Sequence, residues 1–131
     1  MALDRNKFAK GVTRRNDEYE CTIRLNVSDK ATGVMSLVFS FYDGAEKKFT
    51  NGSDYILFTT NDDCDRVYFF DSDPINGYKI FRSNKTSSYA MRMQRRIKGK
   101  EIDFWRANIG DYNLLFDKAE RLYYIDLNYK V

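Results

Sequence analysis

The residues that most often perform chemistry in proteins are scarce in this chain. Its 131 residues include no histidine and two cysteines, Cys21 and Cys64, which are far apart in the sequence. Serine–histidine and cysteine–histidine nucleophilic systems therefore cannot form, and the most usual general base is missing. Without histidine or a paired cysteine motif, a zinc site is excluded as well. The sequence predicts a protein that is not an enzyme and that needs no metal or cofactor.

Three acidic patterns could suggest a metal site or catalysis, but each has a simpler explanation. Residues 61–65, with the sequence NDDCD, lack the glycine and the distal glutamate of a calcium-binding EF-hand loop, so turn chemistry explains them better. Residues 46–48 match only the end of a carboxylate nuclease motif, and no metal-binding aspartate precedes them. Glu46 and Glu101 each begin a predicted helical turn, where the helix dipole and capping favour a carboxylate. No glycine-rich phosphate-binding loop is present.

Basic residues are the remaining groups of chemical interest, because they are unevenly distributed. The chain has 22 basic and 19 acidic residues, and its formal net charge is only +3. Basic side chains gather in residues 1–15 and again in residues 92–100. The second of these ranges contains no acidic residue, whereas aspartates gather between residues 62 and 73. Clustered lysine and arginine can neutralise nucleic-acid phosphates. The alternative is that they face water and discourage aggregation at a sheet edge.

Length and hydropathy indicate one domain that has no membrane segment. A chain of 131 residues can bury a core of its own. Residues 1–15 carry scattered charges and no apolar run of the kind found in a secretory signal, and no stretch approaches the roughly 20 apolar residues of a membrane span. We expect a cytoplasmic protein with both cysteines as thiols, although one disulfide between them stays possible.

Two parts of the chain resemble each other, which predicts an internal duplication. The motif SDYILF followed by RVYFFD in residues 53–71 recurs as GDYNLL followed by RLYYID in residues 110–126. Upstream, GAEKKF in residues 44–49 matches GKEIDF in residues 99–104. The alternative is that two unrelated hairpins have similar compositions. The predicted repeats are residues 18–72 and 77–128, and residues 1–15 form a basic N-terminal arm.

Alternation of apolar and polar residues predicts most of the strands. A short helix is expected after Gly99, ending at Gly110, and a single helical turn is expected at residues 46–51. We therefore predict a mainly β fold with α+β character at the margin. In this fold two strand–strand–short helix–strand–strand units pack about a pseudo-twofold axis as one domain. In addition to the two hairpins, strands are expected at residues 19–27, 34–42, 78–82 and 89–98, and the last strand of the second hairpin is expected to extend over residues 123–131.

The order of strand, short helix and Gly-Asp-aromatic hairpin, the last at Gly110–Tyr112, resembles the AbrB and MraZ swapped-hairpin families of DNA-binding proteins. The chain departs from their pattern where the helix begins, because residues 99–102 contain no proline. No functional residue of those families is transferred to this sequence.

The predicted strand at residues 89–98 distinguishes the two repeats. Aligning Met35 with Met91 preserves a buried face and turns Arg92, Gln94 and Arg96 outward. Arginines four positions apart on a strand lie about 13 Å from each other. A polyanion could follow that row, and aromatic rings nearby could stack on unpaired bases. The candidate nucleic-acid-binding residues are Arg92, Arg96, Lys98, Lys100, Tyr89, Trp105, Arg14 and Arg15.

A second hypothesis is a protein-binding module, for example a small phage-type inhibitor of a host or defence protein. The chain is rich in tyrosine and phenylalanine, with 10 of each, and exposed aromatic rings are typical of protein interfaces. The candidate residues for this hypothesis are Tyr78, Phe69 and Tyr124. A structural subunit of a larger assembly is a third possibility. The sequence does not distinguish DNA from RNA as a partner, nor does it indicate an oligomeric state.

Overall fold

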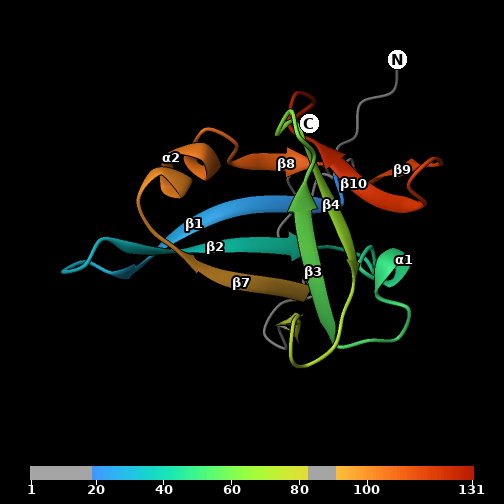
Figure 1. Cartoon of the computed structure of the whole chain (residues 1–131), viewed down its shortest axis with the longest axis horizontal. Coiled ribbons are helices and arrows are strands. Elements are labelled where there is room, and N and C mark those ends of the chain that lie inside the picture. Colours follow the sequence, from blue (N-terminus) through green and yellow to red (C-terminus); the bar gives the residue numbers. More distant parts are fainter. Residues whose placement is uncertain (1–18, 83–90) are drawn as a thin grey trace, which may run out of the picture.

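A computed structural model describes residues 19–82 and 91–131, and in these ranges the chain forms two antiparallel sheets and two short helices (Figure 1). The elements are β1 (Cys21–Asp29), β2 (Val34–Phe41), α1 (Lys47–Thr50), β3 (Tyr55–Thr60), β4 (Arg66–Asp71), β5 (Tyr78–Lys79), β6 (Phe81–Arg82), β7 (Met91–Ile97), α2 (Lys100–Arg106), β8 (Gly110–Tyr112), β9 (Leu115–Asp117) and β10 (Leu122–Asp126). The first sheet has the strand order β6-β7-β2-β1-β8, and the second has the order β5-β3-β4-β10-β9. The predicted mainly β fold is confirmed.

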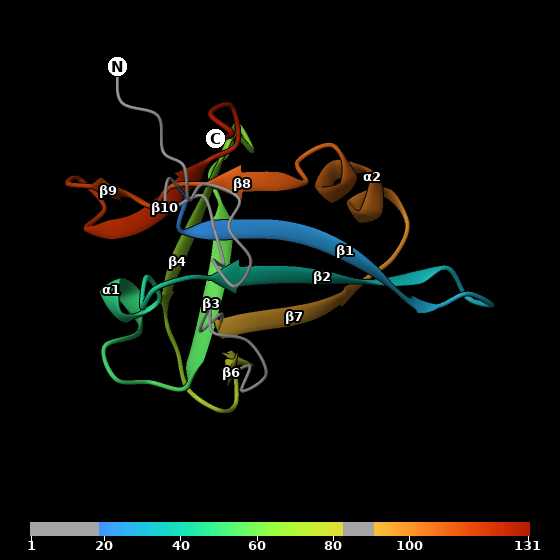
Figure 2. The same ribbon diagram turned by 180° about the vertical axis from the view of Figure 1, so that it is seen from behind.

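The two sheets face each other, and the strands of one run across those of the other (Figures 1 and 2). Their inner faces enclose an aromatic core centred on Phe39, which is fully buried. Its ring contacts those of Phe58, Phe69 and Trp105 with centroid distances of 5.0, 5.2 and 5.5 Å. Such edge-to-face contacts add to the free energy of burying large rings. The core therefore joins both sheets and α2 into one unit.

The alternation predicted for residues 19–27 matches the structure over the first half of β1. Cys21 and Ile23 are fully buried, as are Leu37, Phe39 and Phe41 on the paired strand β2. Val27, however, is 60% exposed, because the far end of the β1–β2 hairpin extends beyond the second sheet (Figure 1). A period of two thus indicates which residues share a face, but not whether another sheet covers it.

Three of the expected strands differ in the structure. Residues 78–82 divide into β5 in the second sheet and β6 in the first, with Ile80 buried between them. Residues 110–117 likewise divide into β8 in the first sheet and β9 in the second. The last strand ends at Asp126 rather than at Val131. At these places the chain passes between sheets or turns, which local alternation does not reveal.

Both predicted helices are present, but their glutamates do not act as caps. Within the described chain neither helix has a capping hydrogen bond from a side chain. Glu46 is 4% exposed, and its Oε2 has no hydrogen-bond partner among the described residues. Glu101 is instead hydrogen-bonded to Arg95. Next to the start of β8, α2 lies beside β1 (Figure 1), where a helix protects a sheet edge.

Both halves of the chain contribute to both sheets. The first predicted repeat, residues 18–72, supplies β1 and β2 to the first sheet and β3 and β4 to the second. The second predicted repeat, residues 77–128, supplies β7 to the first sheet and β10 to the second. The second half also inserts β8 beside β1, for which the first half has no equivalent among the described residues. The duplication and the pseudo-twofold axis are therefore not confirmed, and they stay predictions.

Candidate nucleic-acid interface and a neighbouring cleft

The outer face of β7 carries two of the predicted basic residues. In the antiparallel register of β2 and β7, Arg92 lies opposite Ser40 and Arg96 lies opposite Ser36. Arg92, Gln94 and Arg96 are all exposed. The core residues Met93 and Ile97 alternate with them on the inner face. Alternation along β7 therefore places both arginines on the side of the sheet that faces away from the core.

A third arginine reaches this face from β1. Arg24 is exposed and lies opposite Val38, which pairs on its other side with Gln94. Since adjacent strands are about 4.8 Å apart, β1 and β7 are roughly 10 Å apart across β2. We call Arg24, Arg92 and Arg96 the arginine face. Sequence analysis did not select Arg24, although the alternation of β1 already turned it outward, because nothing local showed that β1 lies two strands from β7.

Two lysines continue the basic surface at the end of β7. Lys98 and Lys100 are exposed, and they belong to the corner that joins β7 to α2. Lys100 is the first residue of α2, and Gly99 before it has φ 67° and ψ −139°. Few residues other than glycine adopt this conformation without strain. The glycine thus lets the chain turn sharply between the two lysines.

The guanidinium groups of the arginine face have no salt bridge within residues 19–82 and 91–131; the ion pairs found there join Lys48 to Glu20, Arg66 to Asp117 and Arg95 to Glu101. Backbone and side-chain hydrogen bonds from Ala31 and Thr32 lower the pKa of Asp29, with a smaller contribution from the charge of Arg96. At the centre of this face Val38 is only 4% exposed. Val38 is therefore not accessible to a ligand, whereas the three arginines are exposed.

Several candidate residues are not where the sequence analysis expected them. Trp105 is 2% exposed and packs in the core, so it has no free ring face on the arginine face, and that expectation is wrong. Phe69 is fully buried between the sheets and cannot be a surface contact. Tyr78 and Tyr124 are half-buried; Tyr78 packs against Phe58, and the Arg66 guanidinium lies 4.5 Å from the Tyr124 ring centroid. Tyr89, Arg14 and Arg15 lie outside the described residues.

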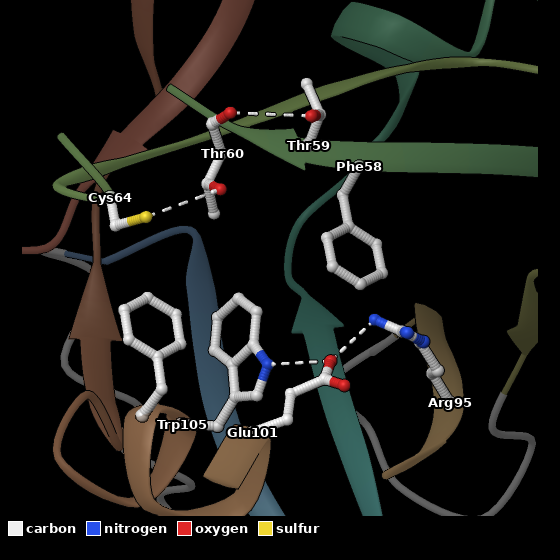
Figure 3. A pocket seen from close by; sticks show the side chains of 8 residues that line it. Phe58, Thr59, Thr60, Cys64, Arg95, Glu101 and Trp105 are labelled. Carbon is white, nitrogen blue, oxygen red and sulfur yellow. Dashed lines mark hydrogen bonds and ion pairs between the residues drawn. The ribbon is translucent and has the colours of Figure 1, made fainter. Parts of the chain in front are cut away.

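A cleft of about 360 Å³ lies between β3 and α2 (Figure 3). Arg95, which lines it, alternates along β7 with Gln94 and Arg96, so the cleft is on the opposite side of β7 from the arginine face. Phe58 and the two threonines that follow it come from β3, and Cys64 comes from the turn after β3. Glu101, Phe104 and Trp105 come from α2, and Arg95 comes from β7. Three different parts of the fold therefore meet at this opening between the two sheets.

A hydrogen-bonded network holds the polar groups of the cleft in place (Figure 3). Arg95 Nη1 donates to Glu101 Oε1 at 2.6 Å, and Trp105 Nε1 donates to the same oxygen at 3.3 Å. The side chains of Arg95 and Glu101 are 36% and 35% exposed. A charged residue can lie on the inner face of β7 because its side chain stays partly exposed in the cleft and pairs with Glu101.

The cleft contains one thiol, and a metal site does not accompany it among the described residues. The described residues contain no group of three or more acidic or cysteine side chains that could hold a metal ion. Cys64 is exposed, and its Sγ lies 3.9 Å from Thr60 Oγ1, with no acid–base partner among the described residues. The cleft thus presents aromatic rings, two hydroxyls, one thiol and one ion pair.

Comparison with protein-family models, with curated proteins and with solved structures finds no match to this chain. Among the described residues, no helix has the length and apolar character needed to cross a membrane. The function of the arginine face and of the cleft must therefore be argued from their own geometry.

Proposed function

We propose that this protein is a non-catalytic binding protein that contacts nucleic acid through the arginine face. One observation carries the proposal. Arg24, Arg92 and Arg96 come from two strands, they are exposed on the same side of the first sheet, and they have no salt bridge in the described ranges. Lys98 and Lys100 extend the same charge towards α2. The protein would hold the backbone of the nucleic acid here.

Guanidinium groups are suited to this task because they can donate two parallel hydrogen bonds to a phosphate and stay charged at any physiological pH. Each phosphate that they neutralise releases counterions, which favours binding at low salt. The logarithm of the affinity should therefore fall linearly with the logarithm of the salt concentration, with a slope of about −0.7 per contact for a single strand. A net charge of only +3 means that the local cluster, rather than the whole molecule, supplies the attraction.

Protein binding is the second candidate function, and one specific observation favours it. The edge strand β9 carries Leu115 and Phe116, which are 42% and 49% exposed. Adjacent exposed apolar side chains at a sheet edge are typical of a contact with another protein. This surface belongs to the second sheet, so separate variants can test the two functions.

The test is charge reversal at Arg92 and Arg96, measured by fluorescence anisotropy with labelled single-stranded and duplex oligonucleotides over a range of salt concentrations. We expect the double variant R92E/R96E to lose affinity by on the order of a hundredfold, since two attractive contacts become repulsive. The matched control is K79E/K118E, which makes the same change of charge at two exposed lysines away from the arginine face, one in β5 and one in the turn after β9. The control should stay within about twofold of the wild type.

Two results would contradict the proposal. One is that the wild type binds neither DNA nor RNA at low salt. The other is that R92E/R96E binds as tightly as the wild type while its circular dichroism spectrum shows an intact fold. Capture of a protein that survives nuclease treatment and is lost in Leu115→Glu would instead support the second candidate.

A further inference from the structure

The cleft lies where a strand bound to the arginine face would arrive. Arg92 and Arg96 project from the outer face of β7, whereas Arg95 projects from the inner face into the cleft. Lys98 and Lys100 occupy the corner after β7, and the chain continues directly into the cleft residues of α2. A nucleic-acid backbone that follows the basic residues around this corner therefore reaches the rim of the cleft.

The walls of the cleft suit a flat ring. The rings of Phe58 and Phe104 are half-buried and line it. The indole of Trp105 contacts both rings, with centroid distances of 5.9 Å to Phe58 and 4.9 Å to Phe104. The volume of the cleft, about 360 Å³, falls within the range of pockets that hold small ligands. Aromatic side chains bind unpaired bases of any sequence because every base has a π face.

The polar groups of the cleft match the hydrogen-bonding edge of a base. Glu101 Oε1 accepts hydrogen bonds from Arg95 and Trp105, which fixes the carboxylate in position. Glu101 Oε2 and the remaining N–H groups of Arg95 have no hydrogen-bond partner within the described residues. An acceptor beside a donor is complementary to the adjacent donor and acceptor on a base edge.

Other ligand classes fit this cleft less well. The ion pair with Glu101 already neutralises Arg95, and the turn that supplies Cys64 also carries Asp62 and Asp63, so a phosphate would meet repulsion here. A purely apolar ligand would displace water from the carboxylate and leave it unsatisfied, which is unfavourable. A neutral heterocycle with polar edges avoids both costs.

We propose that the cleft between β3 and α2 binds one nucleobase, which the strand held by the arginine face presents to it. This inference rests on the proposed function, but the two can be tested separately. The chain contains a single tryptophan, Trp105, which lines the cleft. Its fluorescence therefore reports on occupation of the cleft without any added label.

The experiment titrates the full-length protein with the four common ribonucleosides, with ribose as a control that has no base, and records the fluorescence of Trp105. We expect a saturable change with at least one nucleoside and none with ribose. In parallel, an oligonucleotide of abasic sites should bind roughly tenfold more weakly than a base-containing strand of equal length. R92E/R96E should retain the nucleoside signal, because nucleosides carry no phosphate.

Glu101→Gln tests the polar edge. It keeps the shape of the side chain but can replace a free acceptor with a donor, so the order of preference among the four nucleosides should change. A purely structural role for Glu101 would weaken all four equally and contradict the proposal. The matched control is Asp103→Asn, which makes the same chemical change at an exposed position of α2 that does not line the cleft, and it should leave the order unchanged.

The outcomes separate the two proposals. If oligonucleotides bind but abasic strands bind equally well and Trp105 gives no signal, the base site is refuted and the arginine face stands. If nucleosides give a saturable signal that Glu101→Gln alters, but no oligonucleotide binds, the cleft is a site for free bases, whereas its presentation of a strand's base and the nucleic-acid function are refuted. If neither ligand binds, both proposals are wrong.

Discussion

Arg95 is an example of a residue that breaks the pattern of its strand for a reason outside the strand. It lies on the inner face of β7 between the buried residues Met93 and Ile97, and in the sequence it is the one charged misfit on that face. In the structure it pairs with Glu101 in the cleft between β3 and α2. The misfit was visible in the sequence, but its cause was not, because the partner lies on another element.

Tyr112 is the buried residue with the clearest titration behaviour. Its side chain is fully buried, and its hydroxyl donates a hydrogen bond of 2.6 Å to the carbonyl oxygen of Asn108. Burial, followed by the neighbouring charges of Cys21 and Asp111, raises the pKa of Tyr112 from 10.0 to about 12. Burial likewise raises the pKa of the adjacent Cys21 thiol. Both groups are therefore held in their neutral forms in the folded protein.

The raised pKa of Tyr112 predicts a loss of stability in alkali. Between pH 10 and about 12 the unfolded chain releases the tyrosine proton while the folded protein retains it, so the free energy of unfolding falls as the pH rises. Its contribution over this interval is on the order of 2 to 3 kcal/mol. Urea denaturation across this pH range should show a steeper decline for the wild type than for Tyr112→Phe. Parallel curves for the two proteins would contradict the prediction.

At the scale of elements, β10 shows that alternation does not suffice to make a strand. Alternation continues to Val131, yet β10 stops at Asp126, which pairs with Arg66, the first residue of β4. Beyond this point Leu127 N–H donates to the Asp65 carbonyl and the chain turns. β10 thus ends opposite the first residue of β4, because β4 offers no further strand residues with which a regular ladder of hydrogen bonds could continue.

This boundary predicts how deletions at the C-terminus behave. Removing residues 128–131 loses the bond from Val131 N–H to the Asp111 carbonyl and that from Lys130 Nζ to the Ala107 carbonyl. The free energy of unfolding should fall by about 1 to 3 kcal/mol while the fold is kept. Removing residues 125–131 also deletes the buried Ile125 and Leu127 and should prevent folding. Circular dichroism and urea denaturation of both truncations test this, and equal stability of the two would contradict it.

At the scale of the whole molecule, stability depends on the contact between the crossed sheets. Phe39 lies at this contact and touches rings from both the second sheet and α2. Phe39→Ala should lower the free energy of unfolding by about 3 to 5 kcal/mol, a large share of the roughly 5 to 15 kcal/mol typical of a domain. Phe81→Ala, at a position that is 49% exposed, should cost less than about 1 kcal/mol. Urea denaturation followed by circular dichroism would measure both, and similar losses would show that the core is centred elsewhere.

The alternation of apolar and polar residues, together with the turn residues, was enough to predict the fold class, the short helix after Gly99 and the outward direction of Arg92 and Arg96. Alternation and turn residues are properties of neighbouring positions, so they can be recognised without knowing the fold. The absence of histidine likewise excluded histidine-dependent nucleophilic systems without any knowledge of the fold.

Only the tertiary structure decided which strands are neighbours and which faces are covered. It placed Arg24 on the same outer face as the arginines of β7, two strands away, buried Trp105 and Phe69 between the sheets, and formed the cleft from three separate elements. Alternation assigns a side chain to one of two faces, but the pairing of distant strands decides which face meets the core. That pairing depends on contacts far apart in the chain, which no local pattern contains.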